Sequence, residues 1–307
     1  MQLIEITRRN FRDFHDVSRF IYRDDPNWIA PLDGEVEHIF NPAKNPLLLH
    51  GEAIRWVLQD DRGNWIGRVA AFINYDKAKK SSIPSGGIGF FDCIHDSVAA
   101  ETLFNAAQAW LKARGAAAMD GSINFGENFT YWGVLVEGFM KPGYGMPYNK
   151  PYYRQLFEDY GFKNYFEQYS YHIDLSLPFP ERMVTFASHL AARPGYSFRH
   201  FEKKHARQYI RDLVTIVNRT WEDYMQDYTP LTEEELGGIF EDAKPILVED
   251  FVWYAYKDEQ PIGIVVAFPD VNQILAHFNG RLNIWKGLRF VWMKHHKTMT
   301  RNRVLLG

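Results

Sequence analysis

The sequence predicts a mixed α/β fold (α+β in class), a mostly antiparallel sheet flanked by helices, that occurs twice in the chain. One observation is a repeated phrase, WIGRVAAF at residues 65–72 and PIGIVVAF at residues 261–268. Another is that a similar order of amphipathic helices and alternating strands surrounds each phrase. A spacing of about 200 residues is too long for a solenoid repeat, so we expect two copies of one whole fold.

The first copy is predicted to be an ordered series of strands and helices. Apolar residues at helical spacing predict helix 11–21, and alternation on both sides of Gly63 predicts a hairpin. Asp96 is a good helix N-cap, and Gly115 and Gly161 are typical helix ends. The expected elements are strand 3–6, helices 11–21 and 34–40, strands 53–58, 65–74 and 88–94, helix 98–113, strand 119–123, helix 151–161 and strand 164–175.

Two prolines, Pro178 and Pro180, mark a boundary between domains that we place at residues 1–177 and 178–307. The second copy is expected to be incomplete, because the chain ends inside a strand. Its expected elements are a linking helix 181–192, strand 196–201, helix 207–221, a helix opened by the capping box of Thr232 and Glu235, strands 251–256 and 261–268, a basic helical insertion and a strand from Arg303.

The composition excludes several classes of protein. A net charge of -3 gives no general attraction to nucleic acid, and we expect no such partner. The single cysteine, Cys93, excludes an internal disulfide and a Cys-based zinc cluster, and the adjacent His295 and His296 diverge on a helix, so we expect no metal. No signal region opens the chain, and no apolar run approaches the roughly 18 residues of a membrane span, which predicts a cytoplasmic protein.

The expected order of elements resembles the GCN5-related N-acetyltransferase fold. The segment NKPYYRQLFEDYGF at residues 149–162 is similar to the fourth-helix phrase of that family. The whole chain resembles bacterial tandem acetyltransferase-like proteins, most without an assigned substrate. The shared phrases resemble DPNWIAPL, FFDCIHD, the Asn-rich loop near Asn124, YNKPYY and PDVNQ.

This resemblance implies acetyl-CoA or another acyl-CoA as donor and a small-molecule or peptide amine as acceptor. In the family, helix N-terminal amides in an Arg/Gln-x-x-Gly-x-Gly/Ala loop hold the pyrophosphate. Here the corresponding segment reads HDSVAAETLF, and Asp96 places a carboxylate where phosphate would bind. We therefore expect a degenerate CoA loop in the first domain. In the second, the loop is expected just beyond Gly307, so we interpret the chain as a fragment; the other interpretation is that it has lost the site.

The same resemblance suggests catalytic residues. Many family members protonate the leaving thiolate with a tyrosine of the fourth-helix phrase, at a position occupied here by Phe157. Tyr152, Tyr153 and Tyr160 lie nearby in sequence. Tyr152 and Tyr153 are our candidates for the acid, and packing of the helix is the alternative role for all three.

The loop NFGENFTYWG is the candidate acceptor pocket. Glu127 is the candidate base for the amine. Glycine and asparagine also suit turns, so an ordinary connecting loop is the alternative. The candidate substrate-binding residues are Asn124, Asn128 and Tyr131 from this loop, and Asn149, which opens the fourth-helix phrase.

Three residues lie at the end of the expected strand 88–94 of the first copy. Asp92, Cys93 and His95 are placed where a base or nucleophile would be useful. No third orienting group is identifiable, so we favour a buried strand thiol and a capping histidine.

Residues 281–303 carry seven Lys and Arg residues and no acidic residue, with apolar residues between them. This segment is suited to the phosphates of CoA or to an anionic membrane surface, or it is a solvated helix that packs its aromatic side chains on the core.

The function that we derive is acyl-CoA-dependent N-acyl transfer, with the second domain holding CoA and the first shaping the acceptor site. The alternative is a duplicated fold kept as a non-catalytic binding module, and a peripheral membrane protein is a third hypothesis.

Overall fold

The computed structural model of the chain describes residues 1–123, 125, 132–174, 176–222, 230–244, 246–295 and 304–306. The chain divides into two compact units. The first unit comprises Met1–Phe166 and Asn272–Thr298, and the second comprises Glu167–Val271 and Met299–Gly307. The domain boundary expected after residue 177 remains a prediction.

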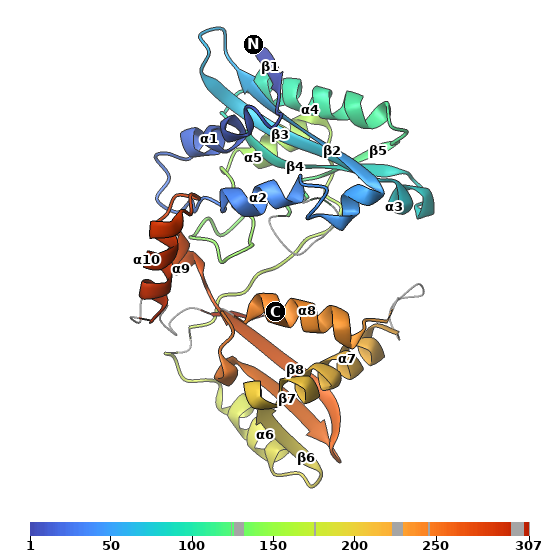
Figure 1. The fold of residues 1–307 in the computed structure, drawn as a ribbon, viewed down its shortest axis with the longest axis vertical. Helices are drawn as coiled ribbons and strands as arrows, with labels where there is room; N and C mark the ends of the chain where they lie inside the picture. Colours follow the sequence, from blue (N-terminus) through green and yellow to red (C-terminus); the bar gives the residue numbers. More distant parts are fainter. Residues whose placement is uncertain are drawn as a thin grey trace. The chain divides into compact units, whose positions relative to one another are not determined.

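The first unit is built on one five-stranded sheet (Figure 1). Its elements are β1 (Gln2–Glu5), α1 (Phe11–Ile21), α2 (Asp33–Ile39), η1 (Pro46–Leu49), β2 (Gly51–Gln59), β3 (Trp65–Asn74), α3 (Tyr75–Lys80), β4 (Ser85–Cys93), α4 (Ser97–Lys112), β5 (Ala118–Gly121), α5 (Tyr153–Tyr160), α9 (Asn272–Leu275) and α10 (Ile284–His295). The strand order is β1-β2-β3-β4-β5, antiparallel throughout except for the parallel pair β4 and β5. This order confirms the predicted fold class.

Helices cover both faces of the first sheet. On one face, α1 and α2 pack against β2 and β3 through a cluster that includes Phe14 and Ala70. On the other face, α4 and α5 contribute Leu103, Phe104 and Phe157 to a larger cluster. Since both faces are buried, β3 has an almost unbroken apolar sequence instead of an alternating one.

Strand β4 contains a bulge at Phe90, where φ is 51°. Its pairing with β3 runs from Gly89 opposite Ala70 to Asp92 opposite Arg68, so β4 has one extra residue between the two pairs. An extra residue reverses the sheet face toward which the following side chains point. Asp92 therefore faces α1 instead of α4.

The second unit is built on a four-stranded antiparallel sheet in the order β6-β7-β8-β9. Its elements are α6 (Glu181–Ala191), β6 (Tyr196–His200), η2 (Lys203–His205), α7 (Ala206–Glu222), α8 (Glu233–Ala243), η3 (Glu249–Phe251), β7 (Val252–Lys257), β8 (Gln260–Pro269) and β9 (Val304–Leu306). The predicted capping box of Thr232 and Glu235 opens α8. The repeated sequence phrase lies on β3 in one sheet and β8 in the other, the third strand of each.

One predicted strand is wrong. Residues 164–174 alternate aromatic and polar side chains, yet they lie outside every strand of the described chain. Tyr165 and Tyr171 are exposed. An alternating segment forms a strand only where a neighbouring strand provides hydrogen bonds to its backbone. The sequence of the segment does not show whether such a neighbour exists.

Candidate active site

Strands β4 and β5, at one edge of the sheet, pair over only the first part of β4. They pair from Ser85 with Ala118 to Ile88 with Gly121, and a last hydrogen bond joins the Ile123 amide to the Ile88 carbonyl at 2.8 Å. Strand β4 then continues to Cys93, and no described strand pairs with its far edge there. A stretch of strand backbone is thus left for other partners.

Two tyrosines at the start of α5 occupy the edge at Cys93. The Cys93 amide donates to the Tyr153 hydroxyl at 2.8 Å, and the Tyr152 hydroxyl donates to the Cys93 carbonyl at 2.8 Å. The next amide, that of Ile94, donates to the carbonyl of Ile66 in β3, so the amide and carbonyl of Cys93 face away from β3. Side-chain hydroxyls therefore take the place of a neighbouring strand.

Beside this edge, the Asp92 carboxylate collects hydrogen bonds from three elements. Its Oδ2 accepts from Ser18 Oγ at 2.6 Å and from Arg68 Nε at 2.7 Å. Its Oδ1 accepts from the Tyr22 hydroxyl at 2.9 Å, and the Tyr153 hydroxyl lies 3.4 Å away. All five residues are buried. The guanidinium of Arg68 compensates the buried negative charge.

The tyrosine hydroxyls of this cluster and the neighbouring Cys93 thiol lose their protons less readily than exposed groups do. Burial, together with the neighbouring Asp92, raises the pKa of Tyr22 and of Tyr153 well above the ordinary tyrosine value. Burial also raises the pKa of the Cys93 thiol, with Asp96 and Asp92 adding to the effect. A thiol needs a lowered pKa to act as a nucleophile near neutral pH, so the structural role that we favoured for Cys93 fits its surroundings.

Asp96, and not His95, caps the following helix. The Asp96 carboxylate accepts from the amides of Val98 and Ala99 at 2.9 Å each. The capping role predicted for His95 is wrong, because its exposed ring stacks on Tyr152 with centroids 4.4 Å apart. The amides at the start of α4 are thus already satisfied by a carboxylate of the chain itself.

The structure describes only some of the predicted site residues. Tyr152 and Tyr153 lie together at the β4 edge, as described above. Asn149 lies apart from that edge, on a loop that it holds in place. Asn124, Glu127, Asn128 and Tyr131 lie outside the described residues, and their roles remain predictions.

The buried side chain of Asn149 connects two loop segments through hydrogen bonds. Its Oδ1 accepts from the Leu135 amide at 2.6 Å, and its Nδ2 donates to the carbonyls of Leu135 and Lys150 at 3.0 and 2.9 Å. These bonds fix the backbone just before α5 and therefore the position of the two tyrosines.

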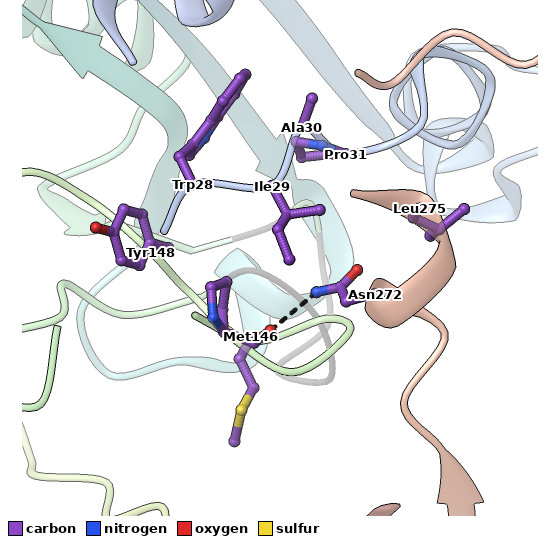
Figure 2. Close-up of a pocket in the computed structure, with 9 residues that line it drawn as sticks. Trp28, Ile29, Ala30, Pro31, Met146, Tyr148, Asn272 and Leu275 are labelled. Atoms are coloured by element: carbon purple, nitrogen blue, oxygen red, sulfur yellow. Dashed lines mark hydrogen bonds between the residues drawn. The ribbon is translucent and has the colours of Figure 1, made fainter. Parts of the chain in front are cut away.

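A small cavity of about 40 Å³ lies near this loop, within the first unit (Figure 2). Asn272 closes one side, where its Nδ2 donates to the Pro142 carbonyl at 3.1 Å. Space of this size holds one or two water molecules and no substrate. The lining residues are Trp28, Ile29, Ala30, Pro31, Pro142, Met146, Tyr148, Asn272 and Leu275.

Aromatic contacts join this cavity to the Asp92 cluster. Trp28 stacks on Tyr22 with centroids 4.9 Å apart and planes at 6°. Tyr148 and Lys150 both donate to Asp25, at 2.9 Å each. Burial raises the pKa of Asp25, but the bonds from Lys150 and Tyr148 outweigh it, and the net pKa is lowered. The cavity wall and the polar cluster are thus one ordered region.

The sequence held a signal for this cluster that we did not use. Arg68 interrupts an otherwise apolar strand, and Asp92 follows two phenylalanines on the next strand. Opposite charges inside two neighbouring apolar strands are expected to pair, because an unpaired buried charge is costly. Ser18 and Tyr22 gave no comparable signal.

Among the described residues, His, Cys, Asp and Glu side chains form no group of three that suits a metal ion. The described helices include none that is both long and apolar enough to cross a bilayer.

No protein-family model matches the chain. It is 30% identical over 300 residues to Protein YghO of Escherichia coli strain K12, across 92% of this chain and 73% of that protein. It is 28% identical over 287 residues to the bacterial ceramide synthase of Caulobacter vibrioides, also across 92% of this chain and 73% of that protein. A solved GCN5-related glucosamine N-acetyltransferase region of a fungal multi-domain β-N-acetylglucosaminidase aligns at 10% identity and a TM-score of 0.45, covering 87% of this chain and 27% of that chain.

Proposed function

The chain belongs to the same family as Protein YghO, and on that premise we propose that it is an acyl-CoA-dependent N-acyltransferase. The observation that carries the proposal is the similarity, across 92% of the chain, to a protein named as a ceramide synthase. Ceramide is an amide of a fatty acid and a long-chain amino alcohol, so making it joins an acyl group to an amine. The acceptor in our proposal is an amine, and a long-chain amino alcohol is the first to test.

The proposed reaction is direct attack. The neutral amine attacks the thioester carbonyl carbon, a C–N bond forms, and the C–S bond breaks. The amine gives up a proton to Glu127 or to water, and the departing thiolate takes one from a tyrosine hydroxyl. A strand amide donates to the carbonyl oxygen as it becomes negative.

Tyr152 is the better of the two candidate acids. The Tyr153 hydroxyl is fully buried and lies between the Cys93 amide, Tyr22 and Asp92. The Tyr152 hydroxyl donates to the Cys93 carbonyl, and Tyr152 is only partly buried. Burial raises the pKa of Tyr152, so its hydroxyl is protonated near neutral pH, although it is a weaker acid than an exposed tyrosine.

The proposal assigns the acyl donor to the second unit. In the first unit, Asp96 already occupies the amides at the start of α4, and Tyr152 and Tyr153 occupy the strand edge at Cys93. The Asp96 carboxylate does not fit the pyrophosphate of a CoA thioester, because both would need the same amides. The first unit would then shape the acceptor site, as in a tandem arrangement.

Turnover with defined donors and acceptors tests the proposal. The chain is mixed with acetyl-CoA or palmitoyl-CoA and with a long-chain amino alcohol, a simple aliphatic amine or a peptide. Release of free CoA thiol is followed, and mass spectrometry identifies the amide. We expect Tyr152→Phe to lower kcat by about 10²-fold or more, whereas Tyr160→Phe is the matched control on the same helix. Amide formation that Tyr152→Phe leaves intact would remove this tyrosine from the role of acid.

The second candidate is a non-catalytic binding module. The closed strand edge and the capped helix start of the first unit favour it. Calorimetric titration of acetyl-CoA and palmitoyl-CoA separates the two, since an acyltransferase must bind a donor. Heat of binding without amide formation for any acceptor would favour the module.

A further inference from the structure

Helix α10 presents an apolar face to solvent. Ile284, Trp285, Leu288, Val291 and Trp292 are between 50% and 83% exposed. At 100° per residue they fall within an arc of about 120° on one side of the helix. A contiguous exposed stripe that contains two tryptophans is unusual on a soluble surface and marks an interaction site.

Basic side chains flank this stripe. On the helical wheel, Arg289 lies beyond one margin of the stripe and Lys294 beyond the other. Arg289 is exposed, and Lys294 is half-buried. No acidic residue occurs from Val271 to the end of the sequence, which includes seven Lys and Arg residues. An apolar stripe between cations is the pattern of a helix that lies in a membrane interface.

The opposite side of α10 is fixed to the first unit. Met293 is buried, and Lys286 Nζ donates to the Phe278 carbonyl at 3.0 Å. Just before the helix, Arg281 pairs with Asp16 of α1 at 2.6 Å. The apolar face is therefore held outward by contacts on the other side and is available without local unfolding.

We propose that α10 docks the protein on an anionic lipid surface, with Trp285 and Trp292 among the acyl chains near the headgroups. Charge complementarity favours a lipid surface over a second copy of the chain as the partner of this face. A second copy on the same face would bring together two basic segments that contain no acidic residue of their own, whereas anionic headgroups are complementary. This inference does not rest on the proposed acyl transfer.

Vesicle co-sedimentation of the full chain tests the docking. Phosphatidylcholine vesicles are compared with vesicles that also contain about one third phosphatidylglycerol. We expect binding to the anionic vesicles, and at least tenfold weaker partitioning for the double variant W285S/W292S. Trp221→Ser is the matched control, because Trp221 is an exposed tryptophan of α7 in the second unit.

The charge contribution is tested separately. The double variant R289Q/K294Q is expected to weaken partitioning by about fivefold for each cation removed. Raising the salt from about 0.1 M to about 0.5 M is expected to weaken binding of the unaltered chain more than that of this variant. Neither measurement requires turnover, so an inactive protein that still binds vesicles would leave docking intact while ending the acyltransferase proposal.

Three results would overturn the docking proposal. One is equal vesicle binding by the unaltered chain and W285S/W292S. Another is a dimer in light scattering that this double variant converts to monomer, which would assign the face to a second copy. The third is binding of single-stranded nucleic acid through the same residues, without binding to vesicles.

Discussion

The two sheets share a strand order but differ in how they are covered. In the first, α1 and α2 pack on one face and α4 and α5 on the other. In the second, α7 and α8 supply a core on one face, with Tyr254 and Tyr256 buried in it. The other face carries Trp253 opposite Val265, both exposed. In the part of the chain that the structure describes, helices thus cover both faces of the first sheet and form a core on one face of the second.

Each unit also contains a buried carboxylate beside its sheet, Asp92 on β4 and Asp212 on α7, and the two have different partners. Asp92 accepts from Arg68 and from two hydroxyl groups. Asp212 accepts from the Tyr256 hydroxyl at 2.7 Å and from Gln208 at 2.8 Å, and the described residues give it no ion pair. The first unit therefore depends on a charge pair where the second depends on neutral donors. We expect mutations to have larger effects in the first unit.

The largest expected effect is that of Asp92→Ala. It leaves the buried guanidinium of Arg68 without its partner, which costs about 3–5 kcal/mol. Asp212→Ala removes a carboxylate from neutral donors and is expected to cost about 1–3 kcal/mol. Hydrogen exchange of amides in β3 and in β8, measured by mass spectrometry on the full chain, reports each unit separately. Equal losses in the two units would contradict the comparison.

The next largest effect on stability is expected from shortening an apolar side chain in the core. Leu103→Ala, at a fully buried position of α4, is expected to destabilise the first unit by about 2–5 kcal/mol. Val265→Ala, on the open face of β8, is expected to stay within about 0.5 kcal/mol. The midpoints of denaturant unfolding check both. A large loss for Val265→Ala would show that this face is covered in solution.

Removing a single tyrosine hydroxyl from each unit is expected to have a smaller effect on stability. Tyr153→Phe leaves the Cys93 amide without its acceptor and is expected to cost about 1–3 kcal/mol, measured by hydrogen exchange of β4. Tyr256→Phe leaves Asp212 with its bond from Gln208 and is expected to cost about 1 kcal/mol. Should Tyr256→Phe cost more, the neutral cluster would be the more tightly coupled of the two.

The smallest expected effect is a change in stability at low pH. Burial raises the pKa of Glu37, but hydrogen bonds from His15 and Arg55 outweigh it and lower the net pKa. A folded pKa below the unfolded value means that this stability is present above the unfolded pKa of about 4.3 and is lost as pH falls through the folded value. We expect Glu37→Gln to remove up to about 1 kcal/mol near neutral pH and to flatten the acid limb of the stability curve.

Urea midpoints between pH 3 and pH 7 would measure this change, with about 0.5 kcal/mol as the smallest resolvable difference. The control is Glu241→Gln, at an exposed pair with Lys244 in the second unit. An unchanged acid limb in Glu37→Gln would show that other carboxylates set the acid response.

Local patterns predicted most of the elements. The helical spacing of apolar residues identified α1 and α7, and glycine identified the end of α5, where Gly161 has φ of 112°. These features depend on residues close together in the chain. The strand expected at 164–175 depended on a partner elsewhere, and that is where the prediction was wrong.

The site was harder to predict than the fold. Tyr152 and Tyr153 were singled out, but as acids from a resemblance and not as partners of Cys93. Tyr153 also approaches the carboxylate of Asp92, whose direction depends on the bulge at Phe90. A bulge depends on the pairing of two strands, so the sequence of β4 by itself does not predict it.

The hydroxyl pair at Cys93 has a consequence for how the sheet ends. An unpaired strand edge invites pairing with any extended chain. Here Tyr152 and Tyr153 satisfy both the carbonyl and the amide of one residue, so the edge is terminated by side chains and not by backbone. Uncovering that residue requires only two phenol groups to move, whereas uncovering a paired strand requires a whole ladder of bonds to break. This stretch of β4 is therefore shielded from pairing by two side chains, and exposing it costs less than breaking a strand pair.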